Sequence, residues 1–277
     1  MSYIDNLKID GNYENNTVIR SNYVIKEYKN IANLITEITA LQMLRNDHLH
    51  VPKVLNVNYQ SRIVTFSRIK GRKLNNFSNN ITPEFLKSFV DFLEKIHMHV
   101  SEGIGYIGQA QIMNWQFFLE NKINIRLSSM NKILVNVDSI KPFLYSRLRG
   151  VQNMEKIGLL HYDLKPANIL VNRRGGFVGL LDFDKAFSGD PILDYAKFSW
   201  RTLNMDEEKI EMLLQVLAPI YGNPDQLKKD IYFYVVVHCI GALSYYSDFQ
   251  DDRYFKIAQN ALSTLTRITD NRGIQWR

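Results

Sequence analysis

The sequence predicts an α+β protein in two lobes: a small N-terminal lobe of antiparallel β-sheet with one helix, and a larger, mainly helical C-terminal lobe. Up to about residue 70, short β-rich runs alternate with turn residues, and a single helical period interrupts them. After Gly71 long helical periods dominate. The 277 residues, 45% of them hydrophobic, are enough to build two such lobes. We therefore divide the chain into residues 1–68, a linker at 69–73, and residues 74–277.

In the first lobe the pattern predicts five strands and one helix. The helix is indicated by apolar residues at helical spacing between Ile31 and Leu44, and the Val51-Pro52 pair ends this region. The strands are expected at residues 7–9, 17–20, 23–28, 54–59 and 62–69.

In the second lobe, two helix starts carry the same signal. Thr82-Pro83-Glu84 offers an N-cap, a proline at the first helical position and an early acid, and Asn223-Pro224-Asp225 repeats this arrangement. A short hairpin is expected from residues 169–171 and 177–181 around a polar, glycine-containing turn. Further helices are expected near 113–127, 138–155, 192–203, 206–220 and 251–268.

The composition argues against several classes of protein. The net charge of +6 comes with no basic tail, and pairs such as Arg173/Arg174 are too short to form the sustained basic face that nucleic acid needs. The single cysteine, Cys239, cannot form an intramolecular disulfide and suits a reducing compartment. The chain starts without a secretory pattern, and its longest apolar run, 231–246, is too short for a bilayer. We expect a cytoplasmic protein with no nucleic-acid or membrane partner, and leave the oligomeric state open.

The residues with the clearest chemistry flank the predicted hairpin. HYDLKPAN at 161–168 provides Asp163 and Asn168, and LLDFD at 180–184 provides Asp182. Phosphoryl transfer needs an acid to accept the proton of an attacking hydroxyl, and oxygen ligands to hold Mg2+ against phosphates. A hairpin returns Asp182 to the loop that carries the other two. Alone, an H-x-D or D-x-D is more often a turn or an N-cap, but the joint pattern is far less accidental.

The first lobe offers a matching pair. Lys26 lies in the strand VIKEY, and Glu37 follows eleven residues later in the expected helix. A strand lysine facing a cleft can contact nucleotide phosphates, and a helix carboxylate can orient it. The alternative for Glu37 is an ordinary exposed helix residue.

These motifs together carry a family resemblance. The chain resembles the aminoglycoside phosphotransferase and choline kinase superfamily, whose fold is similar to that of protein kinases. The resemblance runs from about Asp10 to Ala196 and rests on GNYEN at 11–15, VIKEY, Glu37, IKGRKL at the linker, FLEKIH ending at His97, HYDLKPAN, LDFD, and GDPILDYA at 189–196. The last motif is the most diagnostic, because a protein kinase carries Ala-Pro-Glu further along the chain.

The resemblance implies a Mg2+-dependent kinase that moves the γ-phosphate of ATP or GTP to a hydroxyl of a small molecule, such as an aminoglycoside, an amino sugar or a choline-like compound. It implies Asp163 as the catalytic base, with Lys165 neutralising charge on the transferring group. The nucleotide would lie between the lobes 1–68 and 74–277. The expected nucleotide contacts are Lys26, Glu37, Gly11, Asn15, Ser67 and Ile69, and the expected metal ligands are Asn168 and Asp182, assisted by Asp184.

Two alternatives stay open from the sequence. A Ser/Thr protein kinase is disfavoured because Asp194 follows Asp182 by only twelve positions, too few for a usual activation segment. The sixty-three residues between His97 and His161 form a long insertion with Trp115, Phe117 and Phe118, as expected for walls around a small acceptor. A pseudokinase used as a binding module is disfavoured because no catalytic position is missing.

Overall fold

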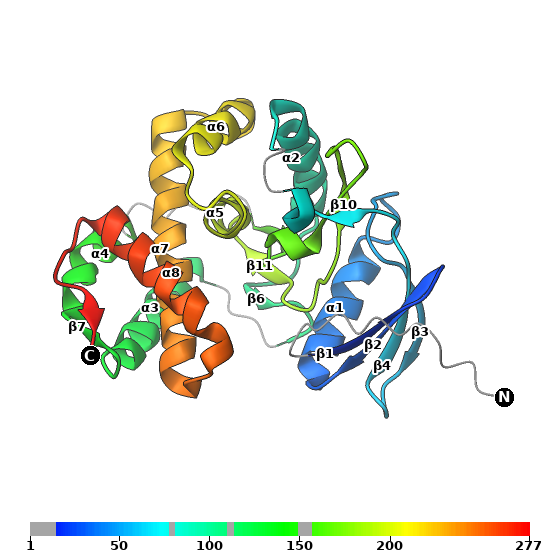
Figure 1. Ribbon diagram of the computed structural model, residues 1–277, viewed down its shortest axis with the longest axis horizontal. Helices are drawn as coiled ribbons and strands as arrows, with labels where there is room; N and C mark the ends of the chain where they lie inside the picture. Colours follow the sequence, from blue (N-terminus) through cyan, green and yellow to red (C-terminus); the bar gives the residue numbers. More distant parts are fainter. Residues whose placement is uncertain (1–14, 78–80, 110–113, 149–156) are drawn as a thin grey trace. The chain divides into compact units, whose positions relative to one another are not determined.

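The computed structural model describes residues 15–77, 81–109, 114–148 and 157–277 (Figure 1). Its contacts group the chain into two compact units. Unit 1 comprises residues 1–111 and 158–188, and unit 2 comprises residues 112–157 and 189–277. The N-terminal strands and both motif-bearing segments, 161–168 and 180–184, therefore belong to the same unit.

Unit 1 contains a four-stranded antiparallel sheet with one helix. The strands are β1 (Asn15–Ile19), β2 (Tyr23–Tyr28), β3 (Val54–Asn58) and β4 (Ile63–Ser67), in the order β1-β2-β4-β3. Helix α1 (Ile31–Met43) begins where the Asn30 side chain accepts a hydrogen bond from Ala32 N at 2.8 Å, and it buries Leu34, Ile38 and Leu41. Four predicted strands and the predicted helix are confirmed, and the strand predicted at 7–9 lies outside the described residues.

The rest of unit 1 surrounds the predicted hairpin. Strands β9 (Ile169–Val171) and β10 (Phe177–Leu180) form that hairpin, and β5 (Arg72–Lys73) extends it to the order β10-β9-β5. A second small sheet has the order β6-β11-β8, from β6 (Gly105–Tyr106), β11 (Phe187–Gly189) and β8 (Gly158–Leu160). Helix α2 (Pro83–His97) starts at the predicted cap, Thr82, which accepts from Phe85 N at 3.2 Å. Short 3-10 helices occur at η1 (Leu74–Phe77) and η4 (Pro166–Asn168).

Two glycines let backbone segments of unit 1 touch. A Cβ added at Gly179 in β10 would lie 2.2 Å from the carbonyl oxygen of His50, and a Cβ at Gly158 would lie 2.3 Å from that of His97. The His50 ring adds a hydrogen bond from Nδ1 to Val178 O at 3.1 Å. The two contacts of His50 hold the hairpin against the turn that precedes β3, and the contact of Gly158 holds β8 against the end of α2. His97 itself is fully buried.

Unit 2 is mainly helical and is organised around α7 (Pro224–Phe249), against which α3, α5, α6 and α8 pack (Figure 1). Asn223 caps α7 by accepting from Asp225 N and Gln226 N, as predicted, and Cys239 is buried in it. Strands β7 (Leu134–Val135) and β12 (Gln275–Trp276) pair antiparallel. The other elements are α3 (Trp115–Met130), η2 (Val137–Ile140), α4 (Lys141–Leu148), α5 (Ile192–Arg201), α6 (Glu207–Tyr221) and α8 (Asp252–Thr269).

The two units together give the α+β class that the sequence predicts, with antiparallel sheets toward the N-terminus and helices in most of the remainder. Among the described residues, no helix combines the length and the apolar character needed to cross a membrane.

Candidate active site

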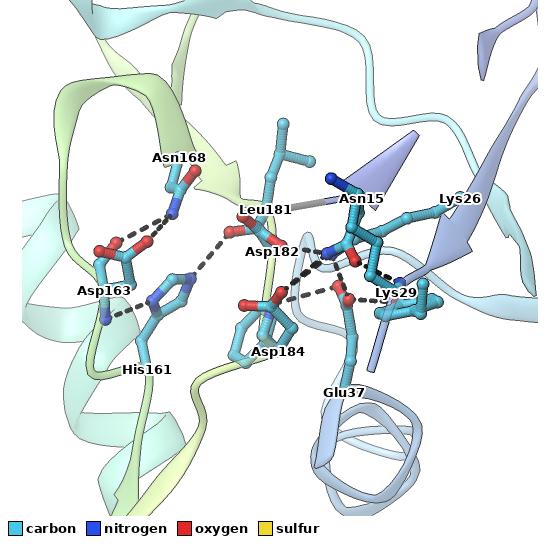
Figure 2. A network of polar contacts seen from close by, with 12 residues as sticks. Asn15, Lys26, Lys29, Glu37, His161, Asp163, Asn168, Leu181, Asp182 and Asp184 are labelled. Atoms are coloured by element: carbon cyan, nitrogen blue, oxygen red, sulfur yellow. Dashed lines mark hydrogen bonds and ion pairs between the residues drawn. The ribbon is translucent and has the colours of Figure 1, made fainter. Parts of the chain in front are cut away.

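Three carboxylates surround the ammonium of Lys26 in unit 1 (Figure 2). Lys26 is 7% exposed on β2, and its Nζ lies 2.7 Å from Glu37 Oε2 and 3.6 Å from Asp184 Oδ2. It also forms an ion pair with Asp182. Burial alone would lower the pKa of Lys26, but the carboxylates of Asp182 and Glu37 outweigh it and raise this pKa well above its usual value. The lysine therefore stays charged.

Glu37 holds this arrangement together from α1. Its side chain is buried, so the alternative of an ordinary exposed helix residue is wrong. It accepts hydrogen bonds from Lys26, from Phe183 N at 3.1 Å, and from the hydroxyl of Tyr28. Burial, and then the Glu37 charge, raises the pKa of Tyr28, which keeps the hydroxyl a donor. The sequence reasoning missed Tyr28, although its position two residues after Lys26 on β2 places both side chains on one face of the strand.

His161 organises the loop that carries Asp163. Asp163 N donates to His161 Nδ1 at 3.3 Å, so the proton of the ring sits on Nε2, which donates to Leu181 O at 2.8 Å. The backbone adds Leu181 N to Asn168 O at 2.9 Å. The loop 161–168 is thus tied to the segment that leads into Asp182, as Figure 2 shows.

Asp163 is held from two sides. Its Oδ2 lies 2.7 Å from Lys165 Nζ and accepts a hydrogen bond of 3.1 Å from Asn168 Nδ2, which also donates to Asp163 O at 2.9 Å. Burial would lower the pKa of Lys165, but the charges of Asp163 and Asp182 outweigh it and raise that pKa. An ammonium therefore stands beside the carboxylate that the sequence assigns as the base.

The pKa values of the two aspartates of LDFD are shifted in opposite directions. Burial would raise the pKa of Asp182, but the charges of Lys26 and Lys165 outweigh it and hold that pKa below its usual range. Burial, and then the Asp182 charge, raises the pKa of Asp184 to about 7. Asp184 Oδ2 accepts a hydrogen bond of 3.0 Å from Asn15 Nδ2, while Asn15 Oδ1 accepts from Lys29 N at 3.4 Å. Asn15 therefore reaches Asp184 from the start of β1.

The oxygen atoms of this site fit Mg2+. Asn168 uses its Nδ2 on Asp163, and among the described residues no hydrogen bond reaches its Oδ1. Asn168 and Asp182 line the same cavity. In the described part of the chain, no group of three or more His, Cys, Asp or Glu side chains is arranged to hold a metal by itself. An amide and a carboxylate suit a Mg2+ ion that takes its other ligands from phosphates and water.

The cavity has a volume of about 350 Å³ and is lined by residues of unit 1 alone. Lys26, Glu37 and Asp182 line one part of the cavity together with the amide of Asn168. Ser67 and Ile69, the residues expected to contact the nucleotide base, also line it. Within the residues that the structure describes, neither the N–H nor the C=O of Ile69 makes a backbone hydrogen bond. Gly11, the remaining predicted nucleotide contact, lies outside the described residues. The other lining residues are Thr17, Ile19, Val24, Pro52, Phe66, Arg68, Gly71, Lys73, Asn75, Ala167, Leu170 and Leu181.

A lysine–glutamate pair on a strand and a helix, beside an H-x-D loop and an aspartate that follows a hairpin, defines a protein of the protein-kinase-like fold. The chain belongs to the Phosphotransferase enzyme family (APH), whose model matches residues 7–228. The predicted family and fold class are therefore confirmed.

Similar solved structures support the fold. Aminoglycoside phosphotransferase APH(4)-Ia is 16% identical, with a TM-score of 0.73 and coverage of 96% of this chain and 93% of that one. A GDP complex of wild-type aminoglycoside 2'-phosphotransferase-IIIa is 17% identical, with a TM-score of 0.67 and coverage of 94% and 91%. Among curated proteins, Serine/threonine-protein kinase NLK2 of Xenopus laevis is 24% identical over 151 residues, which span 53% of this chain and only 30% of that kinase.

Proposed function

We propose that the protein transfers the γ-phosphoryl group of ATP or GTP to a hydroxyl group of a small molecule in a Mg2+-dependent reaction. The observation that carries the proposal is the convergence, within unit 1, of the Lys26–Glu37 pair, the Asn168–Asp182 oxygens and the Asp163–Lys165 pair. Structural ion-pair networks are common, but this one combines a proton acceptor, hard metal ligands and phosphate-binding cations beside a cavity.

The nucleotide occupies the cavity. Its base lies against the backbone of Ser67 to Ile69, where the N–H and C=O of Ile69 are available, and its phosphates lie at Lys26, Asn168 and Asp182. Gly11 and Asn15 belong to the loop over the phosphates, and residues 1–68 form the nucleotide-binding lobe. Solved structures similar to this chain include a GDP complex of aminoglycoside 2'-phosphotransferase-IIIa and a streptomycin–ATP complex of APH(2")-IIa.

The steps of phosphoryl transfer follow from the charged side chains of Asp163 and Lys165 in the loop 161–168. The acceptor oxygen forms a bond to the γ-phosphorus, the bond from that phosphorus to the β–γ bridging oxygen breaks, and the hydroxyl proton passes to Asp163. Lys165 stabilises negative charge on the group in transfer, and Lys26, oriented by Glu37, holds the remaining phosphates. When bound at Asn168 and Asp182, with Asp184 beside them, Mg2+ would neutralise phosphate charge.

The acceptor is a hydroxyl-bearing small molecule of the aminoglycoside, amino-sugar or choline-like kind. Similar solved structures hold kanamycin with GDP in APH(2")-IIIa and gentamicin in APH(2")-IIa. The protein-kinase alternative has less support, because the NLK2 match covers about half of this chain whereas the phosphotransferase structures cover more than nine-tenths. The single, buried cysteine supports a cytoplasmic location.

Two measurements test the proposal. Isothermal calorimetry with ATP and GTP, with and without MgCl2, should show Mg2+-dependent binding. Incubation with labelled ATP or GTP and a panel of kanamycin, glucosamine, choline and thiamine should give a phosphorylated product without any protein substrate. Absence of nucleotide binding at millimolar concentration with magnesium would refute the nucleotide site, whereas binding combined with phosphorylation of proteins only would refute the small-molecule acceptor.

A further inference from the structure

Tyr162, the residue before Asp163, has an unusual backbone. Its φ is +64°, in the left-handed region that glycine adopts freely and that bulky side chains rarely adopt. Asp182 also has a left-handed backbone, with a φ of +69°. Its short polar side chain tolerates this conformation far better than the aromatic ring of Tyr162 does. Backbone strain of this kind persists where the surrounding structure enforces it, and it concentrates at functional sites.

The conformation places the Tyr162 ring in an aromatic cluster. The ring stacks on Phe187 with centroids 4.8 Å apart and an interplanar angle of 20°, and it meets Tyr106 edge-on at 6.2 Å. Tyr106 and Phe187 are themselves 5.4 Å apart and edge-on. One small sheet carries the backbone of this cluster, because Tyr106 on β6 pairs directly with Phe187 on β11, and β8 of the same sheet leads into His161.

Packing of the core does not by itself account for this cluster. Phe187 is fully buried, as a core ring should be, whereas Tyr106 and Tyr162 are only half-buried. The neighbours of Tyr162 on either side are fixed in other directions: His161 donates to Leu181 O, and Asp163 faces Lys165 and Asn168. The sequence therefore keeps a large ring, in a conformation suited to glycine, directly beside the carboxylate assigned as the base.

We propose that Tyr162, supported by Tyr106, is an acceptor-binding residue: its ring forms a wall against which a ring of the acceptor lies, so that the adjoining hydroxyl meets Asp163. This inference rests on the proposed phosphotransfer function and narrows its acceptor to molecules whose reactive hydroxyl is on or beside a ring, in preference to an open-chain alcohol such as choline. Aromatic side chains provide such flat, rigid contact surfaces in small-molecule sites.

The test compares Tyr162→Gly with Tyr162→Phe. Glycine suits the backbone and removes the wall, so the protein should still fold, because relief of strain offsets lost packing. We expect the ratio of the acceptor KM to the ATP KM to rise about tenfold in Tyr162→Gly for the best ring-bearing substrate among kanamycin, glucosamine and thiamine. Tyr162→Phe keeps the ring, so its ratio of the acceptor KM to the ATP KM should stay within about twofold of the wild-type ratio. His48→Gly is the matched control, since His48 is exposed, has a φ of +53° and is not part of the cluster of Tyr162, Tyr106 and Phe187.

The outcomes are distinct. An unchanged ratio in Tyr162→Gly, or equal increases in both KM values, would show a purely structural role and overturn the inference. The inference would also be overturned if the wild-type protein bound Mg2+–ATP but phosphorylated only choline, or none of the ring-bearing compounds. That result would leave the proposed nucleotide site unaffected. A wild-type protein that binds no nucleotide refutes the proposed function itself, and this inference with it. A thermal melt of each variant shows whether it is folded.

Discussion

Replacing Asp163 by asparagine isolates the proton acceptor from the rest of the site. In the structure one oxygen, Oδ2, meets both Lys165 Nζ at 2.7 Å and Asn168 Nδ2 at 3.1 Å. The asparagine side chain can place its carbonyl oxygen in that position and keep both contacts. Its other terminal atom is then an NH2 group, which cannot accept a proton. The substitution therefore removes basicity while leaving the loop geometry in place.

The expected effect is large on catalysis and small on binding. A positioned general base contributes about 10²- to 10⁴-fold in kcat, which corresponds to about 2.7–5.5 kcal/mol of the activation barrier. Asp163 is not among the residues that line the cavity, whereas Asn168 and Asp182 are. We therefore expect Asp163→Asn to bind Mg2+–ATP within about threefold of the wild-type affinity.

The assay combines steady-state turnover on the best acceptor with calorimetry for Mg2+–ATP. Asp138→Asn is a matched control, because Asp138 is an exposed aspartate in unit 2 that pairs with Lys141 at 2.6 Å, and this change should leave both kcat and affinity unaltered. If Asp163→Asn kept near-normal turnover while folded and binding nucleotide, the role assigned to Asp163 would be wrong. Asp184 would then be the next carboxylate to examine.

Three further predictions concern metal binding and stability. Asp182→Asn removes a hard anionic ligand and should raise the MgCl2 concentration for half-maximal ATP binding by roughly tenfold in calorimetry; an unchanged magnesium dependence would contradict this. Glu37→Gln turns an NH2 group toward one of three donors in a buried site and should lower the free energy of unfolding by about 3 kcal/mol in urea titrations, and a loss below about 1 kcal/mol would argue against it. Asn223→Ala removes the cap of α7 and should cost about 1 kcal/mol in the same titrations, with nucleotide affinity unaltered.

The sequence predicts those parts of the fold whose signals are local. Long apolar periods predict α1, α2 and α5 to α8, and an N-cap followed by proline marks where α2 and α7 start. Strands of two or three residues, such as β5, β6 and β11, were not predicted, because they are too short to show a period of two and exist only through pairing with distant segments.

In the candidate site, too, contacts within one segment could be predicted from the sequence, whereas contacts between distant segments could not. Spacing within one segment suffices to propose Asp163 with Asn168, whose contact spans five residues. The meeting of Lys26 with Asp182 spans 156 residues and depends on tertiary packing. Tyr28 and Tyr162 lie within VIKEY and HYDLKPAN, but the motifs do not indicate what they do, because that depends on a tertiary hydrogen bond of Tyr28 and on the left-handed backbone of Tyr162. These features arise only in the folded chain.

The three carboxylates around Lys26 affect the choice of an inactive reference protein. Replacing this lysine is an obvious way to abolish nucleotide use, but here it would leave Glu37, Asp182 and Asp184 as mutually repelling groups within a few ångströms. Loss of activity in such a variant could result from misfolding as well as from lost phosphate binding. Added magnesium would shield the same carboxylates and so change how much misfolding contributes. Asp163→Asn, in which one amide replaces a carboxylate outside that cluster, is the better reference for experiments in cells.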